Sequence, residues 1–239
     1  MLSAPQNSSS GSAIAASHAQ VLARIAAAAQ AAGRDVRSIT VLAVSKGQPA
    51  ARLLQAMDAG LGQFGENYLA EALPKIQALR ERAPVWHFIG RVQANKTRPI
   101  AEHFDWVHGV DRLHVAGRLA EQRPHYAPPL NVCLQVNIAG EAAKGGMAPH
   151  EAPEALAAVA RLPRLRLRGL MCMLPHEADV TTQHLLFGQM RQLLETANAA
   201  GLGLDTLSMG MSGDLETAVA QGATMLRIGT ALFGPREPL

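Results

Sequence analysis

The stretch 41–46, Val-Leu-Ala-Val-Ser-Lys, decides how the rest of the chain is interpreted, because an apolar run ends there in a serine and a lysine before Gly47 and Pro49. A short apolar run bounded by turn residues is typical of a buried strand. Lys46 is therefore expected where this strand leaves the core. Burial lowers the pKa of a lysine and favours the free amine, which attacks carbonyl carbons to form Schiff bases. The alternative is a lysine that simply extends from a strand end into water.

Further short apolar runs follow at regular intervals, with helix-like patterns between them. The expected strands are 41–46, 63–67, 85–90, 104–110, 130–138, 165–173, 204–209 and 223–227. Eight strands alternating with helices in a chain of 239 residues predict an α/β protein, a single (β/α)₈ TIM barrel. An open doubly wound sheet is the competing architecture, but no G-x-G-x-x-G follows the first strand.

The N-terminal part divides into two segments before the first strand. Residues 1–12 are polar and rich in serine, which predicts a disordered lead-in. Residues 13–32 are alanine-rich and end at Gly33, which indicates an extra N-terminal helix. We therefore expect one barrel domain over 13–239.

Composition excludes several classes of protein. The formal net charge is only +3 and the arginines are scattered, which argues against a nucleic-acid partner. No apolar run is long enough for a membrane span, and the N-terminus lacks the pattern of a signal peptide. Cys133 and Cys172 lie in apolar runs without metal-ligand spacing, which indicates reduced thiols, no metal site and a cytoplasmic protein. No long apolar surface stripe stands out, so we expect a monomer or a weak dimer.

Polar residues recur at or just beyond the carboxyl ends of the predicted strands. They are Lys46, Asn67, His87, Asn137, Ser208, Ser212 and the segment 227–230. In a (β/α)₈ barrel these ends meet on one face, which carries the active site. The sequence therefore predicts one site around Lys46.

Two segments have the composition of an anion site: 208–214, Ser-Met-Gly-Met-Ser-Gly-Asp, and 227–230, Arg-Ile-Gly-Thr. Backbone N–H groups, with serine and threonine hydroxyls, bind phosphate. The loops after strands 7 and 8 are the usual phosphate-binding place in this fold. The alternative is that Ser212 and Thr230 are ordinary helix N-caps.

Each of the other candidates also has a structural explanation. Arg227 is consistent with a salt bridge at the barrel rim, and His87, between two aromatic residues, with a hydrogen-bonded core histidine. Asn67 is consistent with a helix cap, Asn137 with a bond to a loop backbone, and Met209 with core packing.

Several longer stretches, taken together, resemble a known family. They are AVSKGQP (43–49), FGENY (64–68), WHFIG (86–90), QANK (93–96), FDWVHGVDR (104–112), LQVNI (134–138), RGLM (168–171), SMGMSGDLE (208–216) and RIGTALFG (227–234). The chain is similar, over nearly all of its length after the N-terminal helix, to the YggS/PROSC family of pyridoxal-5′-phosphate homeostasis proteins. The segment 142–145 matches that family's lysine-bearing loop only loosely.

The resemblance implies a barrel of the alanine racemase N-terminal type that holds pyridoxal 5′-phosphate (PLP) covalently, as a Schiff base on Lys46. Carried over by position, the other cofactor-binding residues are Asn67 beside the ring, His87 near it, Met209 and Gly210 on the phosphate-side wall, Ser212, Gly229 and Thr230 at the phosphate, and Arg227 at the pyridine nitrogen.

An arginine at the pyridine nitrogen opposes protonation of the ring and makes it a poorer electron sink. The resemblance implies that racemases with this arginine use a tyrosine base from a second domain, which neither Tyr68 nor Tyr126 obviously replaces. The expected function is to bind, store or deliver PLP in vitamin B6 homeostasis, with no catalytic residue and without substantial turnover. PLP-dependent apoenzymes are candidate recipients. The alternatives are a weak PLP-dependent amino-acid racemase and a cofactor-free Schiff-base aldolase.

Overall fold

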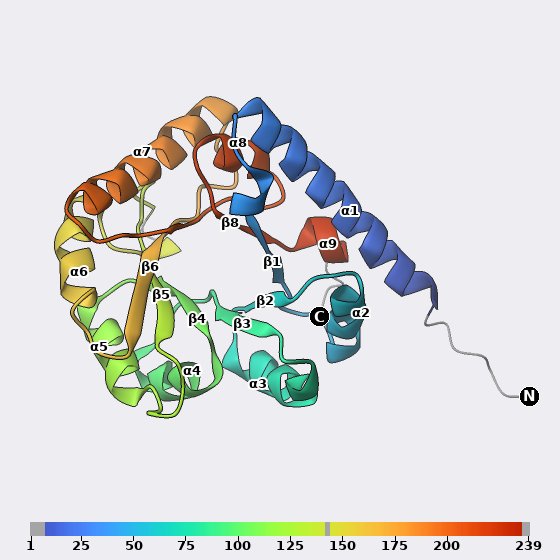
Figure 1. The fold of residues 1–239 in the computed structure, drawn as a ribbon, viewed down its shortest axis with the longest axis horizontal. Coiled ribbons are helices and arrows are strands. Elements are labelled where there is room, and N and C mark those ends of the chain that lie inside the picture. The colour runs from blue at the N-terminus through green and yellow to red at the C-terminus, as the bar shows by residue number, and fades with distance from the viewer. Residues whose placement is uncertain (1–7, 142–143, 236–239) are drawn as a thin grey trace, which may run out of the picture.

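The computed structural model describes residues 8–141 and 144–235, whose strands form one closed parallel barrel in the order β1 to β8 (Figure 1). The strands are β1 (Thr40–Val44), β2 (Gln63–Glu66), β3 (Val85–Phe88), β4 (Trp106–Val110), β5 (Leu130–Gln135), β6 (Leu165–Met171), β7 (Thr206–Ser208) and β8 (Met225–Ile228). The barrel closes where β1 pairs with β8, with Thr40 opposite Met225 and Ala43 opposite Ile228. The predicted (β/α)₈ barrel is confirmed.

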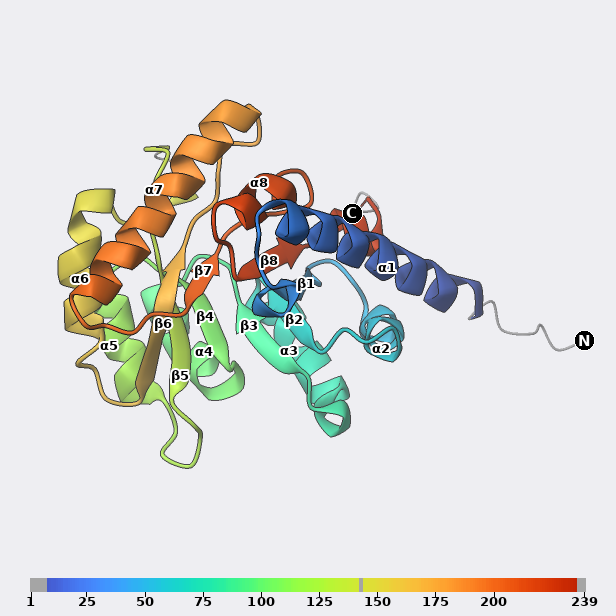
Figure 2. The same ribbon diagram turned by 45° about the horizontal axis from the view of Figure 1, so that its top comes forward.

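Helices surround the barrel as an outer ring (Figures 1 and 2). They are α1 (Ser8–Ala31), α2 (Ala50–Asp58), α3 (Leu69–Ala78), α4 (Thr97–His103), α5 (Leu113–Gln122), α6 (Ala152–Val159), α7 (Val180–Ala199), α8 (Leu215–Ala220) and α9 (Thr230–Phe233), with short 3₁₀ turns at Val36–Ser38, Arg80–Arg82, Ala94–Lys96 and Pro149–Glu151. None of the helices within the described residues combines the length and apolar character needed to cross a membrane.

Helix α1 is the predicted extra helix, and it packs against α2, α8 and α9 (Figure 1). Its buried side chains, Ile14, Val21, Ile25 and Ala29, recur at helical spacing and so form one stripe facing those helices. The helix begins at Ser8, so residues 8–12 of the expected disordered lead-in are helical. Residues 1–7 lie outside the described residues.

Alternate residues of each strand face opposite sides of the sheet. One set packs against the helices, including Ala43, Leu226 and Ile228. The other set faces the barrel interior and forms a smaller apolar cluster of Leu42, Ile89, Trp106, Cys133, Met171 and Met225. Polar side chains share this interior, among them His87, His108, Ser208 and Arg227. The interior is thus a packed core with a polar part.

Most of the predicted strand ranges extend one to three residues beyond the strands in the structure, β5 and β6 among them. β5 ends at Gln135 because Asn137 donates its N–H to the Met147 carbonyl, outside the barrel ladder, at 2.9 Å. β6 ends at Met171 instead of residue 173. The N-cap of α5 is Arg112, whose Nε donates to the carboxylate of the preceding Asp111 at 2.9 Å.

Candidate functional site

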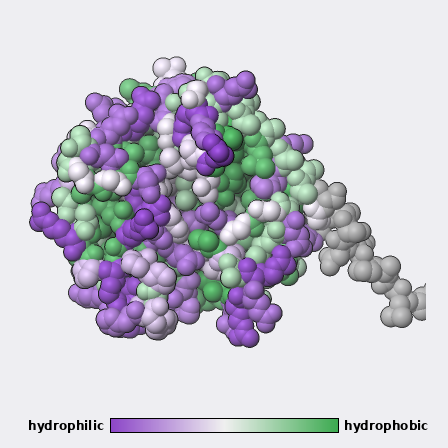
Figure 3. Space-filling model, in the orientation of Figure 1, coloured by the Kyte–Doolittle hydropathy of each residue, from purple (hydrophilic) through white to green (hydrophobic). Residues whose placement is uncertain are grey.

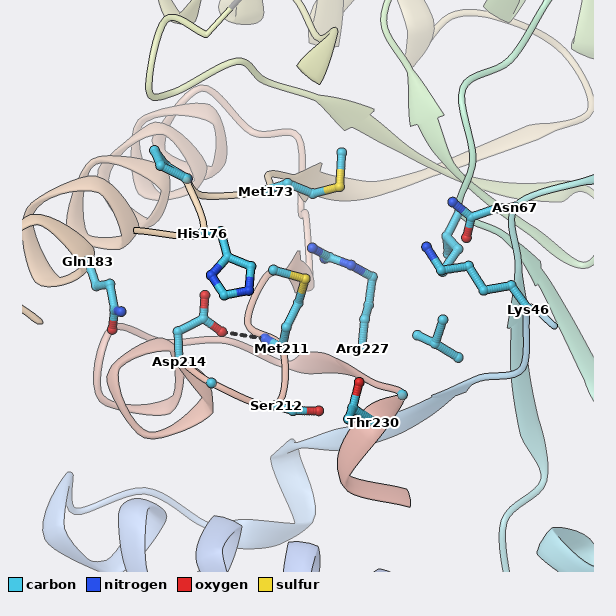
Figure 4. Close-up of a pocket in the computed structure, with 15 residues that line it drawn as sticks. Lys46, Asn67, Met173, His176, Gln183, Met211, Ser212, Asp214, Arg227 and Thr230 are labelled. Atoms are coloured by element: carbon cyan, nitrogen blue, oxygen red, sulfur yellow. Dashed lines mark hydrogen bonds between the residues drawn. The ribbon is translucent and has the colours of Figure 1, made fainter. Parts of the chain in front are cut away.

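A pocket of about 390 Å³ lies at the carboxyl ends of the barrel strands (Figure 4). Its lining residues come from β1, the loops after β2, β3, β6 and β7, helix α7 and the segment 227–230. Six of the predicted site residues line it: Lys46, Asn67, Ser212, Arg227, Gly229 and Thr230. The structure therefore brings residues that are far apart in sequence to one place, as expected for this fold.

Lys46 lies two residues beyond the end of β1, half-buried, with its side chain extended across the pocket (Figure 4). Main-chain bonds hold the chain on both sides of it. The Ser45 N–H donates to the Gly65 carbonyl at 3.0 Å, and the Gly47 N–H donates to the Glu71 carboxylate at 2.7 Å. These bonds fix the backbone from which the amine extends.

A buried charged cluster contacts Ser45, the residue before Lys46, from the side away from the pocket. Lys75 Nζ lies 2.8 Å from Glu66 Oε1 and donates to the Ser45 carbonyl at 2.9 Å. The Ser45 hydroxyl donates to the same Glu66 oxygen at 2.6 Å. Burial raises the pKa of Glu66, while its hydrogen bonds with Lys75 and Ser45 oppose that shift. The residue before Lys46 is thus held by both its carbonyl and its hydroxyl.

Arg227 points from β8 into the base of the pocket, nearly fully buried. Its Nη1 donates to the Ser208 carbonyl at 2.6 Å and to the Ser208 hydroxyl at 2.9 Å, and its Nη2 donates to the Cys172 carbonyl at 2.8 Å. The guanidinium is therefore held by neighbouring strands instead of by a carboxylate at the barrel rim. Burial lowers its pKa from the usual arginine value.

The two segments with the composition of an anion site lie side by side at the pocket wall, where the Ser212 and Thr230 hydroxyls are close together (Figure 4). The Ser212 hydroxyl accepts a hydrogen bond from the Ala231 N–H at 3.3 Å, which joins the segments. Asp214 tightens the first of them by accepting from the Met211 N–H at 2.5 Å, and burial raises the pKa of this carboxyl. Neither hydroxyl residue is an N-cap, since α8 is preceded by Asp214 and α9 by Gly229.

Helix α1 holds the first of these segments from outside the barrel. Arg24 donates to the Ser212 carbonyl at 3.0 Å and pairs with Glu216 at 2.7 Å. The extra helix therefore contacts the main chain of a pocket residue.

Asn67 contributes an amide to the opposite wall of the pocket (Figure 4). Its Oδ1 is buried without a hydrogen-bond partner in the part of the chain that the structure describes. Asn67 is not a helix cap, because Tyr68 takes that position before α3. Gly90 is required next to it, because a Cβ at this position would overlap the Asn67 carbonyl oxygen.

Three predicted site residues do not line the pocket: His87, Met209 and Gly210. His87 is fully buried inside the barrel, where its Nδ1 lies 2.9 Å from His108 Nε2 and its ring stacks on Trp106. Burial lowers the pKa of His87 to about 3. Met209 packs in the core outside the barrel, and Gly210 lies against Ala218 and Leu226.

Two further strand-end residues also lie away from the lining. The Asn137 amide donates to the Glu141 carbonyl at 2.9 Å, a bond to a loop backbone. Ser208 is fully buried and bonds to Arg227, so it supports a lining residue from behind.

Sequence reasoning assigned no site role to five residues that line the pocket. They are Val44, Ile89, Pro175, His176 and Gln183. The segment 173–176 follows β6, so its position after a barrel strand was the available signal. Gln183 carries no such signal because it lies within the first turns of α7.

Comparison with known proteins defines the family. The family model for the alanine racemase N-terminal domain matches residues 17–237. A pyridoxal phosphate homeostasis protein from Pseudomonas aeruginosa is 59% identical over 95% of this chain and 97% of its own length. The protein of the same name from Escherichia coli K12 is 49% identical over 94% of this chain and 97% of its own length. The chain belongs to the pyridoxal phosphate homeostasis protein family.

Two solved structures are similar to this chain. PipY from Synechococcus elongatus, in a structure with PLP bound, is 36% identical with a TM-score of 0.76, covering 82% of this chain and 93% of PipY. Alanine racemase from Corynebacterium glutamicum is 19% identical with a TM-score of 0.69, covering 94% of this chain and 62% of the racemase, and shows the shared fold.

Proposed function

We propose that this protein binds PLP in the pocket at the mouth of the barrel and serves intracellular PLP homeostasis. The observation that carries the proposal is that Lys46 and Arg227 line one pocket together with the hydroxyls of Ser212 and Thr230. An aldehyde that bears an anionic group is the class of ligand that an amine, a guanidinium and hydroxyl donors recognise together. The names of the relatives and the PLP-bound PipY support PLP as that ligand.

The amine, guanidinium and hydroxyl groups that line the pocket match the aldehyde, ring nitrogen and phosphate of PLP. When bound, PLP supplies an aldehyde carbon and an electron-withdrawing ring. The Lys46 amine would condense with that aldehyde and release water, so PLP would be held covalently. Ser212, Gly229 and Thr230 hold the phosphate by hydroxyl and main-chain N–H groups.

The remaining side chains orient the ring. The three hydrogen bonds to Ser208 and Cys172 use three of the five N–H donors of Arg227, which leaves donors for the pyridine nitrogen. Asn67, whose buried Oδ1 has no partner among the described residues, would lie beside the ring. Indirect roles are proposed for His87, Met209 and Gly210, since none of the three lines the pocket. The Gly210 carbonyl, for example, accepts the Arg227 N–H at 2.9 Å.

Storage or delivery of PLP without substantial turnover is the function that we favour. A permanently charged guanidinium at the pyridine nitrogen opposes its protonation and weakens carbanion chemistry. The proposed setting is the cytoplasm, where apoenzymes that need PLP are the recipients. The proposed oligomeric state is a monomer or weak dimer. In support of this, the hydrophobic residues on the face shown in Figure 3 are interrupted by hydrophilic ones.

The first test is Lys46→Ala, with Lys96→Ala as the matched control. The chain has four lysines, Lys46, Lys75, Lys96 and Lys144. We expect the visible absorption of the PLP-loaded protein to disappear in Lys46→Ala and to persist in Lys96→Ala, whose side chain is exposed. Borohydride reduction and peptide mapping of the unaltered protein are expected to place the adduct on Lys46. An adduct on another lysine would contradict the assignment.

Two assays separate the proposed function from the alternatives. Racemisation of alanine and other amino acids by the loaded protein is expected to be negligible, and turnover at ordinary enzymatic rates would reject storage or delivery. A protein that binds a carbonyl substrate but shows no visible PLP band would indicate a cofactor-free Schiff-base aldolase.

A further inference from the structure

Two buried histidines behind Arg227 form, with Ser208, a continuous chain of close polar contacts. The Arg227 Nη1 donates to the Ser208 hydroxyl at 2.9 Å. Ser208 Oγ lies 2.8 Å from His108 Nδ1, and His108 Nε2 lies 2.9 Å from His87 Nδ1. The chain crosses the barrel interior from β8 through β7 and β4 to β3. Both imidazoles and Ser208 are fully buried.

The chemistry of the groups gives this chain a direction. A guanidinium has only donors, so the Ser208 hydroxyl must accept from Arg227. The hydroxyl hydrogen then points to His108 Nδ1, which is its acceptor among the contacts that the structure describes. His108 Nδ1 therefore carries no hydrogen, and in a neutral ring the hydrogen is on Nε2. His108 Nε2 donates to His87 Nδ1, which places the hydrogen of His87 on its Nε2 as well.

The opposite direction leaves the Ser208 hydroxyl hydrogen without an acceptor in a fully buried place. A buried donor without a partner is unfavourable. In the direction described here, one group is unpaired among the described residues, the His87 Nε2–H at the end of the hydrogen-bonded chain remote from Arg227. The opposite direction would leave two groups unpaired, the Ser208 hydroxyl hydrogen and the His87 Nε2 lone pair. The geometry thus satisfies every contact at the guanidinium and leaves the unsatisfied group remote from it.

We infer that Ser208, His108 and His87 are positioning residues that fix the Arg227 guanidinium at the base of the pocket through a one-way hydrogen-bonded chain, with both imidazoles in the neutral Nε2–H form. The consequence for the ligand rests on the proposed function: the chain sets the position of the donor that meets the pyridine nitrogen of PLP. Neutral imidazoles suit this task because they add no second positive charge beside Arg227.

The first experiment needs no ligand. Long-range ¹⁵N–¹H correlation spectra of the ligand-free protein distinguish the Nε2–H form from the Nδ1–H form and from the imidazolium. We expect His87 and His108 both in the Nε2–H form near neutral pH. Finding either ring as Nδ1–H or as imidazolium would overturn the chain and its direction, whether or not the protein binds PLP.

The second experiment tests positioning in the PLP-loaded protein. Ser208→Ala removes the hydroxyl and Ser208→Thr keeps one, while Thr206→Val is the matched control, because it removes a buried hydroxyl of the same strand that bonds to Asp205 instead. We expect Ser208→Ala to weaken PLP affinity by roughly tenfold and to shift the visible spectrum, while borohydride still places the adduct on Lys46. Ser208→Thr is expected to restore the spectrum.

Thermal unfolding of each variant shows whether it is folded. The ¹⁵N–¹H spectra of the wild type decide the direction of the hydrogen-bonded chain even where a variant fails to fold. If Ser208→Ala and Thr206→Val give the same visible spectrum and PLP affinity, the positioning role is overturned. If no form binds PLP, the proposed function fails, and the ligand-free experiment still decides the hydrogen-bonded chain by itself.

Discussion

The two basic side chains of the pocket, Lys46 and Arg227, are supported by different kinds of buried polar group. Under Lys46, the turn is held by a charged pair, Glu66 and Lys75, that bonds to Ser45. Under Arg227, the support is Ser208 followed by two histidines whose pKa values are lowered by burial, so both are neutral. A charged pair has little net charge and fixes the backbone of the turn. A neutral chain fixes a guanidinium without competing with its charge.

The largest expected effect comes from breaking the charged pair. Lys75→Met leaves the fully buried Glu66 carboxylate without its cation, which is expected to cost about 3–5 kcal/mol of unfolding free energy. Chemical denaturation measures this loss. Adding Glu66→Gln to Lys75→Met is expected to recover part of the stability, because the uncompensated charge is removed.

Arg82→Ala is the control for that experiment, since the Arg82–Asp58 pair is exposed to solvent on both sides. It is expected to cost at most about 1 kcal/mol. Equal losses in Lys75→Met and Arg82→Ala would show that the buried pair has no special role.

The neutral chain predicts a specific acid sensitivity. Burial lowers the pKa of His87 from 6.5 to about 3, so between these values the unfolded chain binds a proton that the folded protein does not. Stability therefore falls as pH decreases through this window, with a slope of about 1.4 kcal/mol per pH unit for one such group. The raised pKa values of Glu66 and Asp214 act in the opposite direction.

Comparison of the wild type with His87→Asn isolates the contribution of this histidine, because the two carboxyl groups are present in both proteins. Denaturation at a series of pH values is expected to give a shallower acid slope in the variant. Identical slopes would mean that His87 is not buried in its neutral form.

The smallest expected effect concerns the hold of α1 on the pocket wall. Arg24 is partly exposed and pairs with Glu216, so Arg24→Ala is expected to cost about 1 kcal/mol or less. Because Arg24 also holds the Ser212 carbonyl, we expect PLP affinity to fall by about threefold while affinity for unphosphorylated pyridoxal is unchanged. Arg37→Ala, which removes an exposed pair with Asp35, is the control. A loss shared equally by both ligands would contradict a role at the phosphate.

The sequence was sufficient for the barrel and for the residues at strand ends. Runs such as 41–44 are apolar because parallel strands are covered on both faces, and Lys46 follows such a run directly. The sequence did not predict which face of the sheet a side chain occupies. Neighbouring residues of a strand point to opposite faces, so an error of one residue reverses the answer. Ser208 faces the barrel interior while its neighbour Met209 packs outside, and the sequence alone did not tell which of the two side chains points inward.

Contacts across the barrel were also beyond the sequence. His87 and His108 lie on neighbouring strands, yet only the register of β3 and β4 brings His87 Nδ1 within 2.9 Å of His108 Nε2. Gln183 lines the pocket because of the way helix α7 packs beside it, and no local sequence pattern predicts that packing. The helical start at Ser8 was missed because a serine-rich segment has weak helix propensity of its own.

Closure of the barrel by β1 and β8 has a consequence for the order of events during synthesis. β8 is the strand that carries Arg227 and leads into Gly229 and Thr230, while Lys46 follows the strand made first. On the ribosome, a nascent chain therefore has Lys46 well before it has Arg227, Gly229 and Thr230. Under the proposed function, binding of PLP is a late event that requires the first and last strands to have paired.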